Sequence, residues 1–344
     1  MSIAGRTLQT RRVRETFSEN LEKDFLEHMK ETYLEYGVGD WVITVFNRKS
    51  CGCYKFMINL YNQDATYLDR QVHDLVHLLR LVKETDEHML LPVVAAFVTK
   101  DPHGLDEGTD LLRLLTYYLC DLNSISYPKS CEEKNELLYQ GGILNDMGTR
   151  LLMTYGLEAF DPFGQALGWT AFYEREEPLV LSLLNLEKVS HLVSVQNKGD
   201  DAILIFENPA VFYAVIKATP KVKAICTSGQ INLCGYQVLD LLVASNTQLI
   251  YTGDFDPEGL LIADRLKNRY KRNMTLWGFE KRYYEKILSK NEINSKRLNQ
   301  LEKIRDEGLI EFATYMKQVK VAGYQEYMIE EIIAYSRTLV DMSS

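Results

Sequence analysis

Apolar residues recur at helical spacing through most of the chain up to about residue 186. The stretch 17–36 shows the pattern clearly, because Leu21, Phe25, Met29 and Tyr33 follow one another at intervals of four with charged residues between them. This spacing predicts an amphipathic helix. Similar patterns predict further helices over 71–82, 89–98, 111–122 and 147–155.

Two short apolar runs interrupt this helical pattern. WVITVF (41–46) and CYKFMINL (53–60) contain β-branched and aromatic residues, and they flank the segment Asn47–Gly52. Such a pair of runs around a turn predicts a β-hairpin. The N-terminal region is therefore expected to be mainly helical, with a small hairpin and with a winged-helix-like element as one option.

The hydrophobic pattern changes from about His191 onward, where short apolar runs alternate with helical stretches. The runs lack polar alternation, as expected when both faces of a sheet are covered. Four strands are predicted at 202–206, 222–226, 248–252 and 274–279, and three helices at 210–218, 233–244 and 257–270. This alternation is typical of parallel βαβ units. We expect an α/β domain over 189–344, a mainly helical region over 1–188, and a boundary between about 180 and 195.

Acidic residues follow two of the predicted strands. Glu207 comes directly after the first strand, and Asp254 and Asp256 follow the third one. Ligands of open parallel sheets bind beyond the carboxyl ends of the strands, so we expect these side chains to meet at one edge. Carboxylate oxygens at this spacing suit Mg²⁺ or Mn²⁺, and Glu207 could instead act as a general acid or base.

Each of these acids also has an ordinary structural interpretation. Asp254 and Asp256 could cap the next helix, which begins at Pro257, and Glu207 could be a loop carboxylate. Their convergence from two strand ends favours the metal site over these alternatives. Gly229 and Gln230, after the second strand, could contact a phosphate through backbone groups or could form a simple turn.

Composition changes this picture only a little. The 344 residues carry a net charge of −9, which argues mildly against a free-standing nucleic-acid binder but not against a subunit of a larger complex. The chain has no apolar run of 18 residues, and its first residues lack the apolar core of a signal peptide. Its six cysteines form no CxxC pair, so we expect reduced thiols and a cytoplasmic protein without a membrane segment.

Basic residues cluster after the acidic motif, with tyrosines between them. They are Arg265, Lys267, Arg269, Lys271, Arg272, Lys281, Arg282, Lys286 and Lys290. This strip could face DNA, or it could be a solvated helical surface balanced by nearby acids such as Glu280 and Glu285.

The acidic motif D-F-D-P-E-G (254–259) resembles the D-x-D-x-x-G motif of Toprim domains, and the strand-end glutamate matches the other half of that signature. Three longer blocks are similar to one bacterial Toprim family, the nuclease subunit of Wadjet-type plasmid-defence systems. They are FENPAVF (206–212), CTSGQIN (226–232) and YTGDFDPEGLLIA (251–263). The resemblance is close over 191–280, weaker over 140–190 and weakest before that.

The resemblance implies a Rossmann-like Toprim sheet and a catalytic metal set of Glu207, Asp254 and Asp256 with Mg²⁺ or Mn²⁺. Glu258 is implied either as a further ligand or as a group that contacts the ligands. Glu326 is implied as another ligand, because AGYQEYMIEEI (322–332) resembles a late block of the family. Glu326 could otherwise lie on the solvated face of a terminal helix. The implied activity is endonucleolytic cleavage of double-stranded plasmid DNA, by a homodimer that works with a condensin-like SMC ATPase.

Two other functions remain open at this stage. One is a strand-breaking enzyme like the A subunit of type IIB topoisomerases, which would use a tyrosine nucleophile, although no particular tyrosine is marked by the sequence. The other is a Toprim fold that binds nucleic acid or a partner without turnover. A covalent protein–DNA adduct would indicate the first function, and an unchanged phenotype in Asp254→Ala the second.

Overall fold

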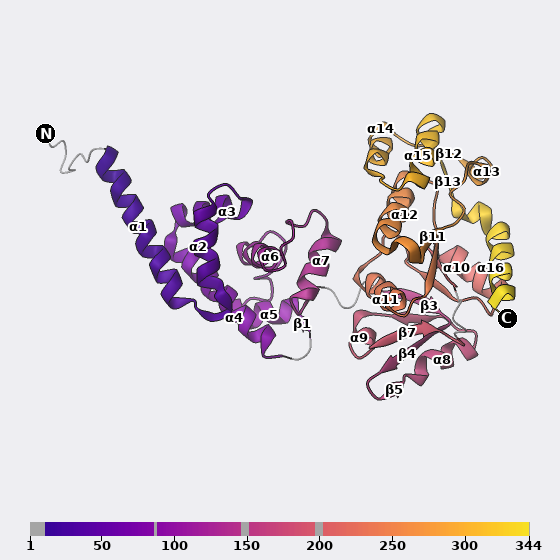
Figure 1. Ribbon diagram of the computed structural model, residues 1–344, viewed down its shortest axis with the longest axis horizontal. Helices are drawn as coiled ribbons and strands as arrows, with labels where there is room; N and C mark the ends of the chain where they lie inside the picture. The colour runs from indigo at the N-terminus through magenta and orange to yellow at the C-terminus, as the bar shows by residue number, and fades with distance from the viewer. Residues whose placement is uncertain (1–10, 86–87, 146–150, 197–201, 344) are drawn as a thin grey trace. The chain divides into compact units, whose positions relative to one another are not determined.

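The chain folds into two compact units, Met1–Asp146 and Met147–Ser344 (Figure 1). The structure, a computed structural model, describes residues 11–85, 88–145, 151–196 and 202–343. The expected boundary between 180 and 195 lies inside the second unit, so the predicted division into 1–188 and 189–344 is wrong. Strands that precede residue 188 belong to the main sheet of that unit, which explains the difference.

The first unit is helical. Its elements are α1 (Arg11–Thr32), η1 (Glu35–Gly37), α2 (Val38–Arg48), α3 (Gly52–Gln63), α4 (Ala65–Lys83), β1 (Met89–Leu90), α5 (Leu91–Thr99), α6 (Asp110–Leu122), α7 (Cys131–Gln140) and β2 (Ile143–Leu144). The predicted helices over 17–36, 71–82 and 111–122 are confirmed in type, and that over 89–98 is confirmed from Leu91 onward. A winged-helix element needs an antiparallel hairpin, whereas β1 and β2, the unit's strands within the described residues, pair in parallel.

The predicted β-hairpin of 41–60 is wrong, because both runs are helices. In α2 the buried residues Val38, Val42 and Val45 recur every three or four positions. In α3 the buried residues Cys53, Phe56, Met57 and Leu60 do the same. The six-residue run WVITVF alone is compatible with a strand, but the longer window has helical periodicity, and burial of one helical face outweighs the strand propensity of its valines.

The second unit is built on a mixed six-stranded sheet. Its elements up to the first parallel strand are β3 (Leu152–Tyr155), β4 (Leu157–Asp161), β5 (Gly164–Gln165), α8 (Leu167–Glu174), β6 (Leu179–Leu181), α9 (Leu183–Leu186), β7 (His191–Ser194) and β8 (Ala202–Phe206). The strand order is β11-β10-β8-β9-β3-β6, and β5, β4 and β7 form a separate antiparallel sheet. The four strands from β8 onward were predicted.

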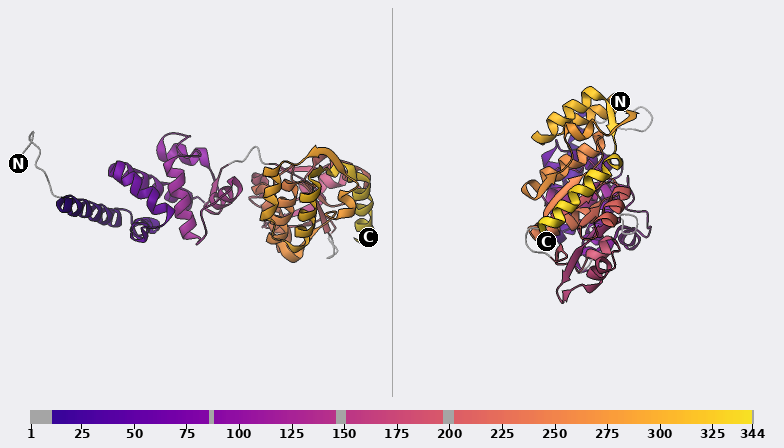
Figure 2. Two further views of the ribbon diagram at one scale, coloured as in Figure 1. Left: turned by 90° about the horizontal axis from the view of Figure 1, so that it is seen from above. Right: turned by 90° about the vertical axis from the view of Figure 1, so that its right-hand side faces the viewer.

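The parallel part of the sheet confirms the predicted βαβ pattern. It consists of β8, α10 (Pro209–Ala218), β9 (Ala224–Cys226), α11 (Leu233–Ala244), β10 (Gln248–Thr252), α12 (Pro257–Tyr270) and β11 (Met274–Leu276). β8 pairs in parallel with both β9 and β10, and β10 pairs in parallel with β11. α10 and α16 (Ile329–Ser343) pack together on one face, and α11 and α12 cover the other (Figures 1 and 2).

The two antiparallel strands β3 and β6 were not predicted. Residues 152–155 form β3, which pairs with β9 and β6, so the helix predicted over 147–155 is wrong there; its first residues lie outside the described part of the chain. The run LMTY is short, and apolar periodicity does not separate a buried strand from a helical turn at this length. The described helices are each too short or too polar to cross a membrane.

The remaining elements lie between β11 and the C-terminus. They are η2 (Lys271–Asn273), α13 (Lys281–Tyr284), β12 (Leu288–Glu292), α14 (Ser295–Leu298), η3 (Asn299–Lys303), α15 (Glu307–Val319), β13 (Val321–Gly323) and η4 (Gln325–Met328). β12 and β13 form an antiparallel pair. The segments α14, η3 and α15 pack against α12, whose N-terminus carries the acidic motif.

Candidate metal centre

The acidic residues lie where the parallel sheet changes direction. The chain leaves β8 through α10 on one face of the sheet, and it leaves the adjacent strand β10 through α12 on the other face (Figure 1). Such a switch point opens a crevice beyond the carboxyl ends of the two strands. Phe206 is paired with Thr252 at these ends. The next residues, Glu207 and Gly253, are therefore neighbours at the rim.

Glu207 lies against the backbone of the acidic motif. Its Oε2 accepts a hydrogen bond of 3.3 Å from the hydroxyl of Tyr251, a fully buried side chain. A Cβ atom at Gly253 would lie 2.5 Å from the Tyr251 hydroxyl and 3.0 Å from Glu207 Oε2. Glycine at 253 thus leaves the space that this carboxylate and this hydroxyl occupy.

Asp254 is held by a segment from the far end of the chain. Phe255 and Gly323 exchange two backbone hydrogen bonds of 2.9 Å, which join the acidic motif to β13. Two residues after Gly323, the backbone amide of Gln325 donates to Asp254 Oδ1 at 2.9 Å. The side chain of Phe255 is buried against Phe312 with ring centroids 5.5 Å apart. Phe255 therefore anchors the loop in the core while its acidic neighbours lie at the rim.

Asp256 is fully engaged by protein groups. Its Oδ1 caps α12 by accepting from the Gly259 amide at 2.8 Å, and its Oδ2 accepts from Arg297 Nη2 at 2.5 Å. Arg297 also donates from Nε to both oxygens of Glu258, at 3.1 and 3.0 Å. The structural interpretation of Asp256 as a helix cap is thus correct for one of its oxygens, and Glu258 is an ion-pair partner of Arg297.

The carboxylates raise one another's pKa. Burial raises the pKa of Glu207 to about 7, and the charges of Asp254 and Asp256 add to this effect. Burial likewise raises the pKa of Asp254 to about 6, with Glu326 and Asp256 as the charged contributors. Hydrogen bonds and the charge of Arg297 lower the pKa of Glu258, against the opposing effect of burial. The cluster is therefore short of positive charge around Glu207 and Asp254.

Glu326 reaches this cluster from the C-terminal segment. Its Oε1 accepts a hydrogen bond of 2.6 Å from Asn208 Nδ2, and Asn208 also caps α10. Glu326 lies in η4, directly before α16, and its side chain is exposed, as in the alternative interpretation, but its charge raises the pKa of Asp254. The structure thus brings Glu207, Asp254, Asp256, Glu258 and Glu326 together.

Gly229 and Gln230 lie on the neighbouring loop, and one polar group of each is occupied. The Gly229 amide donates to the backbone oxygen of Glu207 at 3.1 Å, and Gly229 has a φ of 99°. Arg265 donates to the side-chain oxygen of Gln230. The interpretation as a turn therefore accounts for the Gly229 amide, which is not available to a phosphate.

The chemistry of these donors fits a hydrated hard cation. Glu207 and Asp254 offer carboxylate oxygens, and Gln325 Oε1 is a buried carbonyl oxygen without a hydrogen-bond partner in the described residues. Within the same residues, no three His, Cys, Asp or Glu side chains already stand close enough to cage a metal ion. Mg²⁺ keeps several of its waters and uses one or two carboxylates, so such a cage is not required.

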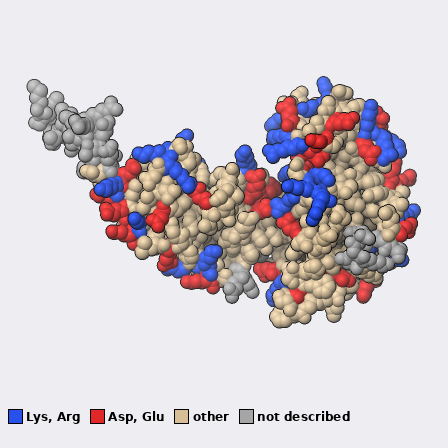
Figure 3. Space-filling view, viewed as in Figure 1, with Lys and Arg blue, Asp and Glu red and all other residues tan. Residues whose placement is uncertain are grey.

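Four of the nine residues of the predicted basic strip pair with acids. Arg269 pairs with Asp240 at 2.7 Å, Lys281 with Glu285 at 3.7 Å, Arg282 with Glu280 at 2.7 Å and Lys286 with Glu331 at 3.4 Å. Figure 3 shows the same mixture, because Lys and Arg gather over α12 and α14 with Asp and Glu between them. These pairs favour the interpretation as a solvated, balanced surface.

Three contributors were missed from the sequence: Tyr251, Arg297 and Gln325. Tyr251 precedes the acidic motif by three residues and could have been noticed as a polar group at a strand end. Arg297 carries no local signal, and Gln325 stands in the block 322–332, from which only Glu326 was predicted as a site residue. The roles of both residues arise only when distant segments fold against the rim.

Two family models match the chain. Residues 179–335 match the model described as a protein of unknown function C-terminus (DUF2399), and residues 1–159 match that of a protein of unknown function N-terminus (DUF3323). A search of curated proteins gave no match. The C-terminal match includes every acid of the cluster and Arg297, but its description assigns no chemistry, so a proposed function depends on the geometry of the site.

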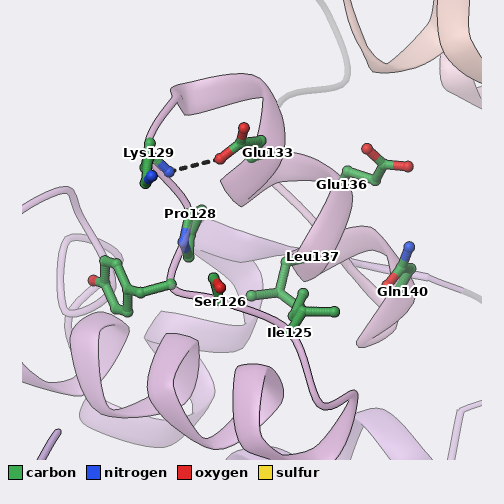
Figure 4. Close-up of a pocket in the computed structure, with 9 residues that line it drawn as sticks. Ile125, Ser126, Pro128, Lys129, Glu133, Glu136, Leu137 and Gln140 are labelled. Carbon is green, nitrogen blue, oxygen red and sulfur yellow. Dashed lines mark hydrogen bonds between the residues drawn. The ribbon is translucent and has the colours of Figure 1, made fainter. Parts of the chain in front are cut away.

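The first unit contains a pocket. It lies beside α7 and is lined by Ile125, Tyr127, Pro128, Leu137 and neighbouring polar residues (Figure 4). The Lys129 amide donates to Glu133 Oε2 at 2.7 Å, which ties the loop to the first turn of the helix. None of the residues predicted from sequence to form a site lines this pocket.

We expect Gly253→Ala to destabilise the second unit by about 1–3 kcal/mol, because the new methyl group overlaps Tyr251 and the Glu207 carboxylate. Chemical denaturation measures the change. Gly168→Ala is the matched control: it lies in α8 with no atom within 4 Å of an added Cβ, so it should leave stability unchanged or raise it by up to about 1 kcal/mol. Equal effects of the two substitutions would contradict this account of the rim.

We expect Glu207→Gln to stabilise the metal-free protein at pH 8, by up to about 3 kcal/mol. The pKa of Glu207 is about 7 in the folded state against 4.5 ordinarily, so the native state binds this proton more tightly. Its contribution to the unfolding free energy therefore falls as pH rises from about 4.5 to about 7, and glutamine removes that loss. Urea unfolding at pH 5 and pH 8 tests the sign, and a variant less stable than wild type at pH 8 would refute it.

Proposed function

We propose that this protein is a metal-dependent DNA endonuclease of Toprim type, with Glu207, Asp254 and Asp256 as its catalytic acids and Mg²⁺ or Mn²⁺ as its cofactor. The observation that carries the proposal is the meeting of Glu207 with the D-x-D motif at the switch point of a parallel sheet. Two of these acids have raised pKa values and no cationic partner in the described residues. The preference for DNA comes from the resemblance of the three sequence blocks to the nuclease subunit of Wadjet-type systems.

The residues of the rim have separate tasks in this proposal. A bound divalent cation would polarise the scissile phosphate and stabilise charge on the leaving oxygen. Glu207 and Asp254 would hold it, with Tyr251 and the Gln325 amide fixing the orientation of their carboxylates. Asp256 keeps the first turn of α12 and Arg297 in place. The N-termini of α10 and α12 both lie at this rim, where their partial positive charge favours a phosphate.

A tyrosine nucleophile has no support in this arrangement. Tyr251 is the tyrosine that contacts the acids in the described residues, but it is fully buried and donates its hydroxyl to Glu207. Burial raises its pKa well above the ordinary value, which disfavours the phenolate. We therefore propose that the protein cleaves DNA by hydrolysis. We further propose that it acts as a homodimer with an SMC-like ATPase in the cytoplasm.

We expect purified protein, supplied with the partners encoded beside it, to cut plasmid DNA when Mn²⁺ or Mg²⁺ is present. Cleavage should stop when EDTA removes the metal. Glu207→Gln, Asp254→Asn and Asp256→Asn should each reduce cleavage by at least about a hundredfold, in line with losses at catalytic groups. Glu187→Gln, an exposed acid after α9, is the matched control and should cut like wild type.

The DNA ends separate hydrolysis from the alternatives. Free 5′-phosphates with no protein attached after SDS treatment would support hydrolysis, whereas a covalent adduct would indicate a topoisomerase-like enzyme. Intact plasmid under every metal condition, with retained binding to DNA or partners, would instead indicate a non-catalytic Toprim protein.

A further inference from the structure

Arg297 divides the acidic cluster into two unlike halves. It lies in α14, a short helix whose first turn is capped by Asn294, which accepts from the Arg297 amide at 2.9 Å. The buried side chains of Leu298 and Leu301 follow directly and anchor the segment, which packs against α12. The capped and packed α14 therefore holds the Arg297 guanidinium next to the acidic motif.

The first half consists of Asp256 and Glu258, and it is satisfied by Arg297. The guanidinium contacts both oxygens of Glu258 and one of Asp256. Gln300 donates to Glu258 Oε1 at 3.1 Å, and the Gly259 amide holds the other Asp256 oxygen. All four carboxylate oxygens thus have a protein donor, and a cation here would have to displace the arginine.

The second half consists of Glu207, Asp254 and Glu326, and its hydrogen-bond donors are neutral. They are the Tyr251 hydroxyl, the Gln325 amide and the side chain of Asn208. No Lys, Arg or His of the described residues forms an ion pair with these three acids. The side-chain oxygen of Gln325, Oε1, has no hydrogen-bond partner in the described residues. The backbone amide of the same residue donates to Asp254. A hard cation placed here meets oxygen ligands without displacing a charged group.

We propose that the site takes one divalent cation, on the Glu207–Asp254 half, and that Arg297 supplies the second positive charge on the Asp256–Glu258 half. This inference rests on the proposed function and assigns Asp256 a positioning role through Arg297 in place of direct ligation. A bidentate guanidinium–carboxylate pair is geometrically well defined, and a partner left alone in a partly buried site is unfavourable, so the arginine resists exchange for an aqueous ion. Arg297 Nη1 has no hydrogen bond within the described residues, which leaves it open to a phosphate oxygen.

Counting bound Mn²⁺ on the full-length protein tests the inference without any activity measurement. Electron paramagnetic resonance of free Mn²⁺ at pH 8 should show one strongly bound ion per wild-type chain. Asp254→Asn should lose that ion. Asp256→Asn should keep it, because asparagine retains the cap to the Gly259 amide and the Glu207–Asp254 half is untouched.

Two substitutions of Arg297 form the matched pair. Arg297→Met removes the charge and should raise the count to two, whereas Arg297→Lys keeps a charge and should leave it at one. Circular dichroism checks that Arg297→Met is folded. The Mn²⁺ count of Asp256→Asn tests the inference even if Arg297→Met does not fold. Two ions on wild type, loss of the ion in Asp256→Asn, or a single ion on folded Arg297→Met would each overturn the inference. Absence of any bound ion on wild type would instead overturn the proposed function itself.

Discussion

The parallel pairing of β8 with β10 is the contact on which the candidate site depends. Because Phe206 is in register with Thr252, the two strands end together and their next residues share one rim. The helices that follow leave on opposite faces of the sheet, which is the arrangement that places ligand sites at the carboxyl ends of parallel strands. A slip of the register by one residue would turn the strand faces over and separate Glu207 from the acidic motif.

The acidic motif divides its residues between rim and core. Phe255 enters an aromatic cluster, and its backbone pairs with Gly323, so the intervening acids have little freedom to move. Gly259 allows the Asp254 carbonyl to approach α12, since a Cβ there would lie 2.3 Å from that oxygen. The site is completed only when residues 295–326 fold onto α12 and β10. Local turn geometry and distant packing therefore both determine where the acids lie.

The sequence is informative where local pattern and burial agree. The strands from β8 to β11 and helices α10 to α12 are predictable, because each is an uninterrupted apolar run or an amphipathic stretch punctuated by Gly, Pro or Asn. β3 and β6 are short antiparallel additions whose pairing depends on β9, and no local signal marks them. α2 and α3 resemble strands only when their apolar runs are taken without the flanking residues. Arg297 lies in the polar run SKRLNQ, and its contact with Glu258 is a tertiary contact that residue spacing does not predict.

The arrangement of charge also bears on how this rim would meet DNA. With a net charge of −9 and four of the nine residues of its basic strip paired with acids, the chain offers little general attraction to phosphate. The unneutralised acids at the rim would repel a phosphodiester directly. A cation bound between Glu207 and Asp254 reverses the local sign, and Arg297 then adds a fixed positive group beside it. Binding of the cation and binding of DNA would consequently be coupled, and by thermodynamic reciprocity each would raise the affinity for the other. In the proposed endonuclease, such coupling would restrict firm DNA contact to the metal-loaded protein and would leave initial capture of DNA to a partner subunit or a second copy of the chain.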